Sequence, residues 1–95
     1  MTPDLAVEHD PAAERFVVGS GPDLAELVYR TDGRRMLLLH TAVPPHLRGR
    51  GIAGRLVRAA ADHALHEGLT LVPVCSYAVT WVHAHAHELD GPPKP

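Results

Sequence analysis

The amino-acid sequence predicts a single mixed α/β domain, in which antiparallel strands precede one parallel strand–helix–strand unit. The dipeptide Asp32-Gly33, which favours a tight hairpin turn, separates two strand-like segments. Further along, an apolar segment at 35–43 is followed by a long helical stretch and by a second apolar segment at 69–75. Two strands joined by a helix form a parallel pair with a right-handed crossover.

The segments before the hairpin have the composition and spacing of strands. A β-branched run at 15–19 predicts the first strand. Apolar and polar residues then alternate over 24–30, which is typical of a strand with one buried face. Residues 1–13 are polar and interrupted by prolines, and 91–95 are rich in proline. We therefore expect a flexible N-terminal arm at 1–13, one domain at 14–90 and a disordered tail at 91–95.

The strand predicted at 35–43 is apolar on both of its faces, so we expect it in the middle of a sheet that is covered on both sides. The stretch after it, up to Glu67, predicts a helix with an apolar residue at every fourth position, namely Ile52, Leu56, Ala60 and Ala64. Gly68 stands where a helix C-terminus favours a left-handed residue. Residues 77–88 predict a second helix.

Pro73 lies inside the last predicted strand and has no N–H group for a sheet hydrogen bond. One edge of this strand must therefore be unpaired at Pro73. If its partner is the strand at 35–43, the two strands separate towards their C-terminal ends. A gap between parallel strands gives a ligand a place to enter.

The composition excludes several classes of protein. The chain has 95 residues, 45% of them hydrophobic, which suffices for one small domain. Nine Lys and Arg against 11 Asp and Glu give a net charge of −2, which excludes a generally basic nucleic-acid binder. No apolar run approaches the roughly 20 residues of a membrane span, and 1–13 lack the apolar region of a secretory signal. The single cysteine, Cys75, cannot form an internal disulfide, so we expect a cytoplasmic protein.

Three glycines, Gly49, Gly51 and Gly54, stand between a buried strand and the long helix. Glycine lets a backbone approach a ligand closely, and the first turn of a helix offers N–H groups and a dipole that favour an anion. Positive charge is added nearby by three arginines, Arg48, Arg50 and Arg55. This stretch predicts a phosphate site, although the glycines could instead only shape a tight connection. No Lys–Ser/Thr pair follows, and no second mononucleotide half fits in this length, so Walker A and dinucleotide sites are not favoured.

The run Arg48-Gly49-Arg50-Gly51-Ile52-Ala53 resembles the Arg/Gln-x-x-Gly-x-Gly/Ala signature of the GCN5-related N-acetyltransferases. Segments similar to a small single-domain branch of this family extend over about 15–88, and include His40-Thr41-x-Val43-Pro44. The resemblance implies a twisted, mostly antiparallel sheet of about five strands, with one parallel pair that splays at its C-terminal end, and two main helices. It also implies acetyl-coenzyme A as co-substrate, with its pyrophosphate held by the turn from Arg48 to Gly54.

The same resemblance implies where the reaction takes place. It places the pantetheine arm against the backbone of Ala42 and Val43, where a main-chain N–H could polarise the thioester carbonyl. Cys75 would lie near the acetyl group, as an acceptor of acetyl, as an acid for the leaving thiolate, or only as a small buried side chain. His40 would act as a base or hold the bulged strand, and His85 matches a late histidine of the family. We take Cys75, His40 and His85 as candidate catalytic residues.

The chain departs from the family pattern at two places. Ala42 stands where members commonly have Glu, and 83–86 read His-Ala-His-Ala instead of Arg-Arg-His-Pro. The first change removes a carboxylate beside the acetyl site, and the second removes two arginines. Two pairs of histidines share a face of a predicted helix: His83 with His87, and His63 with His66. A zinc site needs three or four ligands, so we expect surface histidines and no metal.

The sequence therefore predicts an acetyl-coenzyme A-dependent N-acetyltransferase that acts on a primary amine of a small molecule, peptide or protein. A non-catalytic module that binds or senses acyl-coenzyme A is the alternative, motivated by Ala42. A third possibility is a protein-interaction module that uses the histidine-rich helix, with the glycine turn purely structural. We expect no nucleic-acid or membrane partner, and a monomer or weak homodimer.

Overall fold

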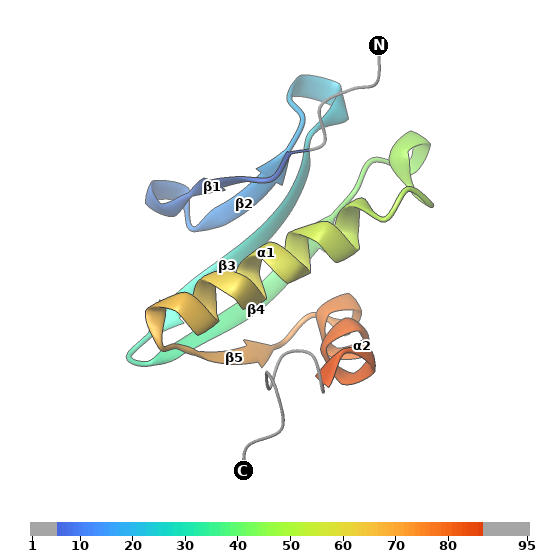
Figure 1. The fold of residues 1–95 in the computed structure, drawn as a ribbon. Coiled ribbons are helices and arrows are strands. Elements are labelled where there is room, and N and C mark those ends of the chain that lie inside the picture. The colour runs from blue at the N-terminus through green and yellow to red at the C-terminus, as the bar shows by residue number, and fades with distance from the viewer. Residues whose placement is uncertain (1–5, 87–95) are drawn as a thin grey trace.

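The chain folds into one five-stranded sheet with a long helix packed across it (Figure 1). The computed structural model describes residues 6–86. In chain order and in sheet order the strands are β1 (Glu8–Asp10), β2 (Arg15–Val18), β3 (Ala25–Asp32), β4 (Arg35–Ala42) and β5 (Thr70–Pro73). The helices are α1 (Ile52–Glu67) and α2 (Ser76–Ala84), with short 3-10 turns at Pro11–Ala13, Gly21–Asp23 and Pro45–Leu47. Neighbouring strands are antiparallel except β4 and β5, so the predicted fold class is confirmed.

The hairpin predicted at Asp32-Gly33 joins β3 to β4, and its last paired residues are Asp32 and Arg35. Further from the turn the ladder contains a bulge. Tyr29 pairs with Leu38 and the preceding Val28 pairs with His40, so β4 contributes one extra residue between these pairs. A bulge bends its strand and redirects the side chains that follow it.

The helix α1 connects β4 to β5 as the predicted parallel crossover, and Gly68 ends it with a left-handed φ of 70°. Pairing of β4 with β5 stops at Leu38 and Pro73, whereas β4 continues to Ala42. The amides of Val74 and Cys75 both donate to the Leu38 carbonyl, at 2.9 and 3.1 Å. The predicted separation of the two strands towards their C-terminal ends is thus confirmed.

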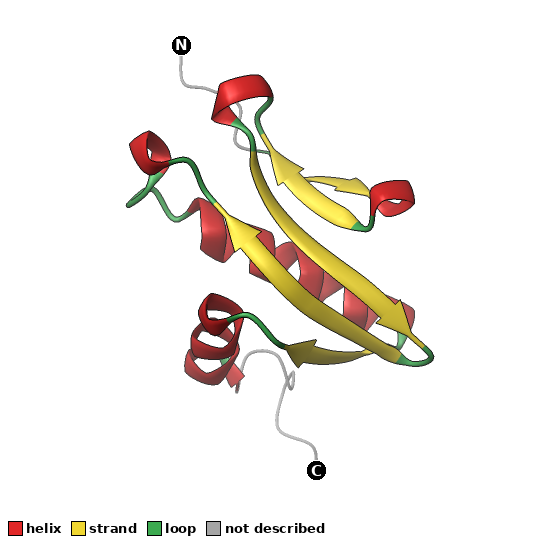
Figure 2. Cartoon of the chain, turned by 180° about the vertical axis from the view of Figure 1, so that it is seen from behind, coloured by secondary structure: helices red, strands yellow, loops and turns green. Residues whose placement is uncertain are grey.

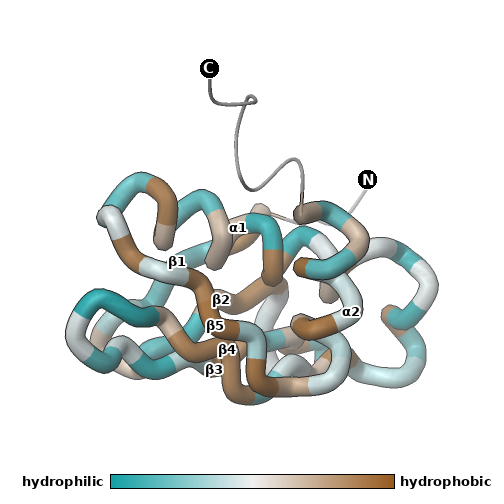
Figure 3. Tube along the Cα trace, turned by 90° about the horizontal axis from the view of Figure 1, so that it is seen from below, coloured by the Kyte–Doolittle hydropathy of each residue, from teal (hydrophilic) through white to brown (hydrophobic). Residues whose placement is uncertain are grey.

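The core lies between α1 and one face of the sheet. Met36 and Leu38 of β4 are fully buried on this face, while Leu37 and Leu39 are half-buried. The view from behind shows the opposite face of β3 and β4 with no helix in front of it (Figure 2). Seen from below, α1 lies on one side of the strands, which carry long hydrophobic stretches (Figure 3). The expectation that both faces are covered is therefore wrong for the described residues, because the one long helix packs on a single face.

The second helix lies beyond the end of β5 rather than over the sheet (Figure 1). Its Ala78 and Trp81 are buried against the core. The predicted range 77–88 overlaps α2, and residues 87 and 88 lie outside the described part of the chain. Within 6–86 the structure has no helix with the length and apolarity needed to span a membrane.

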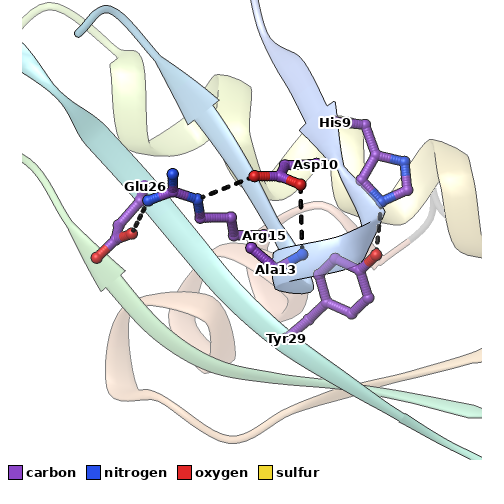
Figure 4. Close-up of polar contacts among 6 residues, drawn as sticks. All are labelled: His9, Asp10, Ala13, Arg15, Glu26 and Tyr29. Carbon is purple, nitrogen blue, oxygen red and sulfur yellow. Dashed lines mark hydrogen bonds and ion pairs between the residues drawn. The ribbon is translucent and has the colours of Figure 1, made fainter.

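Nothing in the sequence predicts β1, which lies within the residues 1–13 interpreted as an arm. Its His9 ring stacks on Phe16 with 4.2 Å between centroids, and His9 Nε2 lies 2.5 Å from the Tyr29 hydroxyl (Figure 4). His63 of α1 meets the edge of the same imidazole at 4.5 Å. Aromatic contacts therefore attach a polar three-residue strand, which has no strand-like hydrophobic pattern of its own, to the edge of the sheet.

Candidate functional site

The opening beside the C-terminal half of β4 is shaped by the bulge. Residues that pair across a ladder point to the same face of the sheet. Thr41 pairs with the buried Leu27 and so faces α1, whereas His40 pairs with Val28 and faces the open side. Without the extra residue this alternation would be reversed. The bulge thus presents His40 and Ala42 on the open face, at the level where β5 has already ended.

The glycine turn forms the wall opposite this strand end. Gly49 and Gly51 have φ values of 83° and 75°, which side chains with a Cβ rarely adopt. Gly51 is the N-cap of α1 and supplies no side-chain hydrogen bond, so the amides of the first helical turn are left for another acceptor. Nothing lies within 4 Å of a Cβ placed at either glycine. Arg48 Nε donates to the Val43 carbonyl at 3.3 Å and ties the turn to the end of β4.

A pocket of about 610 Å³ lies between these two walls. Its lining comes from the end of β4, the glycine turn, the start of α1 and one residue of α2: His40, Thr41, Ala42, Val43, Leu47, Arg48, Gly49, Gly51, Ile52, Ala53 and Tyr77. The pocket therefore joins the exposed start of a helix to a strand edge with no neighbouring strand. The first is suited to an anion and the second to an extended chain with amide groups.

Comparison with known proteins assigns the chain to a family. The sequence pattern of the GCN5-related N-acetyl-transferases matches residues 15–90. The chain belongs to the GCN5-related N-acetyltransferase family. The chicken (Gallus gallus) and human (Homo sapiens) proteins named NATD1 are each 40% identical to it over 81 residues, covering 82% of this chain and 74% and 72% of theirs. A GCN5-like protein from Staphylococcus aureus, solved by NMR, superposes with a TM-score of 0.73 at 26% identity, covering 90% of this chain and 84% of that one. Members of this family generally use acetyl-coenzyme A.

Of the residues predicted to bind the coenzyme, Ala42, Val43 and most of the signature turn line the pocket. Arg50 and Gly54 are not among the lining residues. A Cβ at Gly54 would lie 3.2 Å from Trp81 Nε1 and 3.5 Å from the Tyr77 hydroxyl. This glycine of the signature therefore allows α2 to pack closely on α1, which places Tyr77 at the pocket.

Cys75 is half-buried at the point where β5 leads into α2. Its Sγ lies 3.5 Å from Thr41 Oγ1, and Thr41 lines the pocket. Cys75 itself is not among the residues that line the cavity. The three readings of Cys75 as acceptor, acid or small buried side chain therefore remain predictions.

The structure does not bring His85 to the pocket. Its ring stacks on Trp81 with 4.0 Å between centroids, and its Nδ1–H donates to the Trp81 carbonyl at 2.8 Å. The guanidinium of Arg58 lies over the same indole, 5.2 Å from its centroid. These contacts stabilise the packing of α2, on which Tyr77 depends.

Tyr77 is the titratable residue at the pocket that the sequence did not single out. It lies in the first turn of α2 and is 42% exposed, so a ligand can reach it. Burial of part of the ring raises the pKa of its phenol above that of a free tyrosine. The signal that could have identified Tyr77 is its position two residues after Cys75, where the separated strand turns into a helix.

Proposed function

We propose that this chain transfers the acetyl group of acetyl-coenzyme A to a primary amine. The observation that carries the proposal is the pocket itself, which combines an uncapped helix N-terminus, an unpaired strand end and a phenol within one cavity. An anion-binding turn alone would fit many phosphate ligands. The strand end beside it suits the amide-containing arm that coenzyme A carries.

The coenzyme would be held mainly by the backbone. The amides of Ile52 and Ala53, in the first turn of α1, face the position of the pyrophosphate, and the Arg48 guanidinium adds charge beside it. The pantetheine arm would lie along β4 at Ala42 and Val43, where β5 no longer competes for the strand edge. A main-chain N–H at this position would donate to the thioester carbonyl oxygen as negative charge develops on it.

The side chains at the pocket supply both proton transfers that the reaction needs. The neutral amine attacks the thioester carbon, so a C–N bond forms and the C–S bond breaks. The proton lost by nitrogen passes to the His40 imidazole, and the leaving thiolate takes a proton from the Tyr77 hydroxyl. One proton leaves nitrogen and one reaches sulfur, so the products are the acetamide and free coenzyme A. Exchange with water restores His40 and Tyr77.

Cys75 has a supporting place in this scheme. Its Sγ lies 3.5 Å from Oγ1 of Thr41, a residue next to Ala42 in the strand segment that would carry the thioester. Direct transfer to the amine needs no acetylated cysteine. A covalent acetyl-cysteine would first require the thiol to reach the cavity, because Cys75 is not among the lining residues.

One observation favours a second function, binding of acyl-coenzyme A without turnover. Among the described residues that line the pocket, none carries a carboxylate, and His40 is the sole side chain there suited to accept a proton from an amine. A module that senses acyl-coenzyme A would need the coenzyme site but not this base.

Release of free thiol decides between these functions. Acetyl-coenzyme A is mixed with the protein and a panel of primary amines, and thiol release is followed together with the mass of the acetylated amine. Binding of coenzyme A is measured in parallel by calorimetry. We expect binding and amine-dependent thiol release; binding without release would favour the sensor, and absence of any heat of binding would contradict both.

A further inference from the structure

The open face of the sheet next to the pocket carries one carboxylate close to His40. Glu26 of β3 pairs directly with Ala42, and Val28 pairs with His40, so all four side chains point to the same face. Glu26 and His40 are therefore diagonal neighbours in the ladder, within reach of each other's side-chain ends. His40 and Ala42 line the pocket, and Glu26, which is not a lining residue, lies next to them on β3, one strand further from β5.

The Glu26 carboxylate is held in a fixed position. Arg15 Nη1 of β2 donates to its Oε1 at 3.1 Å, and the Arg15 Nε lies 3.5 Å from Asp10 Oδ2 (Figure 4). Asp10 in turn accepts from the Ala13 amide at 3.3 Å. Figure 4 shows this chain of contacts on the side of the sheet away from His9 and Tyr29. Two carboxylates and one guanidinium leave the group with a net charge of −1, in which the Glu26 side chain is 29% exposed.

Charge thus divides the surroundings of the pocket into two sides. Arg48 lies on the side of the glycine turn, where the coenzyme phosphates would bind. Glu26 lies across β4, on the side from which an acceptor can approach the open face. An alkyl amine arrives at neutral pH as an ammonium ion, which a carboxylate can bind through a charge-assisted hydrogen bond.

We propose that Glu26 binds the ammonium group of the acceptor and delivers it to His40, which makes Glu26 a specificity-determining residue for cationic amines. This inference rests on the function proposed above. The ammonium donates to the carboxylate of Glu26 and passes one proton to the imidazole of His40, which is exposed and releases this proton to water before the attack. The neutral nitrogen then attacks the thioester as already described. Glu26 supplies, from the neighbouring strand, the negative charge that position 42 lacks.

The test measures binding rather than turnover. Nα-acetyl-lysine amide is titrated into the protein, with and without coenzyme A, while the NMR signals of the His40 imidazole are followed. The uncharged analogue Nα-acetyl-norleucine amide, which lacks the ammonium group, is the control probe. We expect the lysine probe to shift the His40 signals and to bind about fivefold more weakly to Glu26→Gln, as for loss of a partly exposed ion pair. Glu67→Gln, a change of the same kind at the far end of α1, should leave its affinity unchanged.

Three results would overturn the inference: no binding of the lysine probe, equal affinity of Glu26→Gln, or a norleucine probe that binds as tightly as the lysine probe. Glutamine can still accept a hydrogen bond from Arg15, so the fold of the variant should persist, and its circular dichroism and melting temperature check this. A protein that binds the lysine probe through Glu26 but releases no thiol with acetyl-coenzyme A supports the inference while contradicting the proposed transfer.

Discussion

Replacing Gly51 with valine tests whether the glycine turn binds phosphate. Gly51 has a φ of 75° at the N-cap of α1, and nothing lies within 4 Å of the Cβ position. The substitution therefore has two separate effects. Forcing a branched residue into left-handed backbone costs about 1–2 kcal/mol of folding free energy. The new side chain also projects into the space in front of the first helical amides.

The loss of affinity for coenzyme A should be larger than backbone strain alone would cause. We expect the dissociation constant for coenzyme A to rise by at least about tenfold, which corresponds to about 1.4 kcal/mol. Gly33→Val is the matched control, because Gly33 has a φ of 61° and equally open surroundings but lies in the β3–β4 hairpin, far from the pocket. Both variants should lose stability to a similar extent, by about 4–8 °C in melting temperature per kcal/mol.

Calorimetry measures the affinity of the wild-type protein and of both variants for coenzyme A, and thermal melts measure their stability. Weaker binding in Gly51→Val, with normal affinity in Gly33→Val, would assign the loss to the turn. Unchanged affinity in Gly51→Val would refute the idea that this turn meets a phosphate. Equal loss in both variants would refute it as well, because strain alone would then explain the effect.

Three further predictions concern the proton donor, the thiol and the edge strand. Tyr77→Phe should lower kcat on the order of 100-fold with coenzyme affinity unchanged, and a variant with normal turnover would exclude the phenol as the acid. Cys75→Ala should lower turnover more than it weakens coenzyme binding. If Cys75→Ser restores turnover, the contact with Thr41 matters, whereas low turnover in both variants would indicate thiol chemistry. Normal turnover in Cys75→Ala would remove Cys75 from the reaction. Burial, and then the neighbouring His63, lower the pKa of His9 below 6.5 despite the opposing effect of Asp10. Because the folded state then resists protonation of His9, the free energy of unfolding should be highest above about pH 6.5 and should fall as the pH drops through the folded pKa of His9. Urea titrations at several pH values measure this dependence, and His63→Gln should make it weaker.

The parts of the fold that the sequence predicted are those with a local signal. The Asp32-Gly33 turn and the four-residue apolar repeat of α1 each specify their element within a few residues. Pro73 predicted that one edge of its strand is unpaired, and β5 is indeed the edge strand of the sheet. The separation from β4 begins just after Pro73, where the Val74 and Cys75 amides both donate to the Leu38 carbonyl. By contrast, β1 depends on contacts of His9 with residues of three other elements, and no local sequence pattern predicts such contacts.

In the candidate site, too, features with a local sequence signal could be predicted and those that depend on packing could not. Backbone features of the glycine turn follow from residue types, so Gly49, Gly51 and their neighbours could be placed at the pocket from the sequence alone. Tyr77 could not, because its position depends on how closely α2 approaches Gly54. The sequence also predicted, wrongly, that both faces of β4 are covered. An apolar strand indicates burial, but the pattern does not show that a single long helix must cover the sheet and can pack on only one face.

The bulge in β4 links these observations to the choice of acceptor. The side that would hold the coenzyme is built from main-chain groups, which tolerate many side chains and can stay constant among members with different substrates. The side that would bind the acceptor is built from side chains whose direction depends on a single extra residue in β4. That residue turns His40 outward, brings it diagonal to Glu26 and leaves Thr41 facing Cys75. A strand without the bulge would bury His40 and expose Thr41, so the same glycine turn would serve a site with no base on the open face. The register of one strand therefore determines which side chains the pocket presents on the open face.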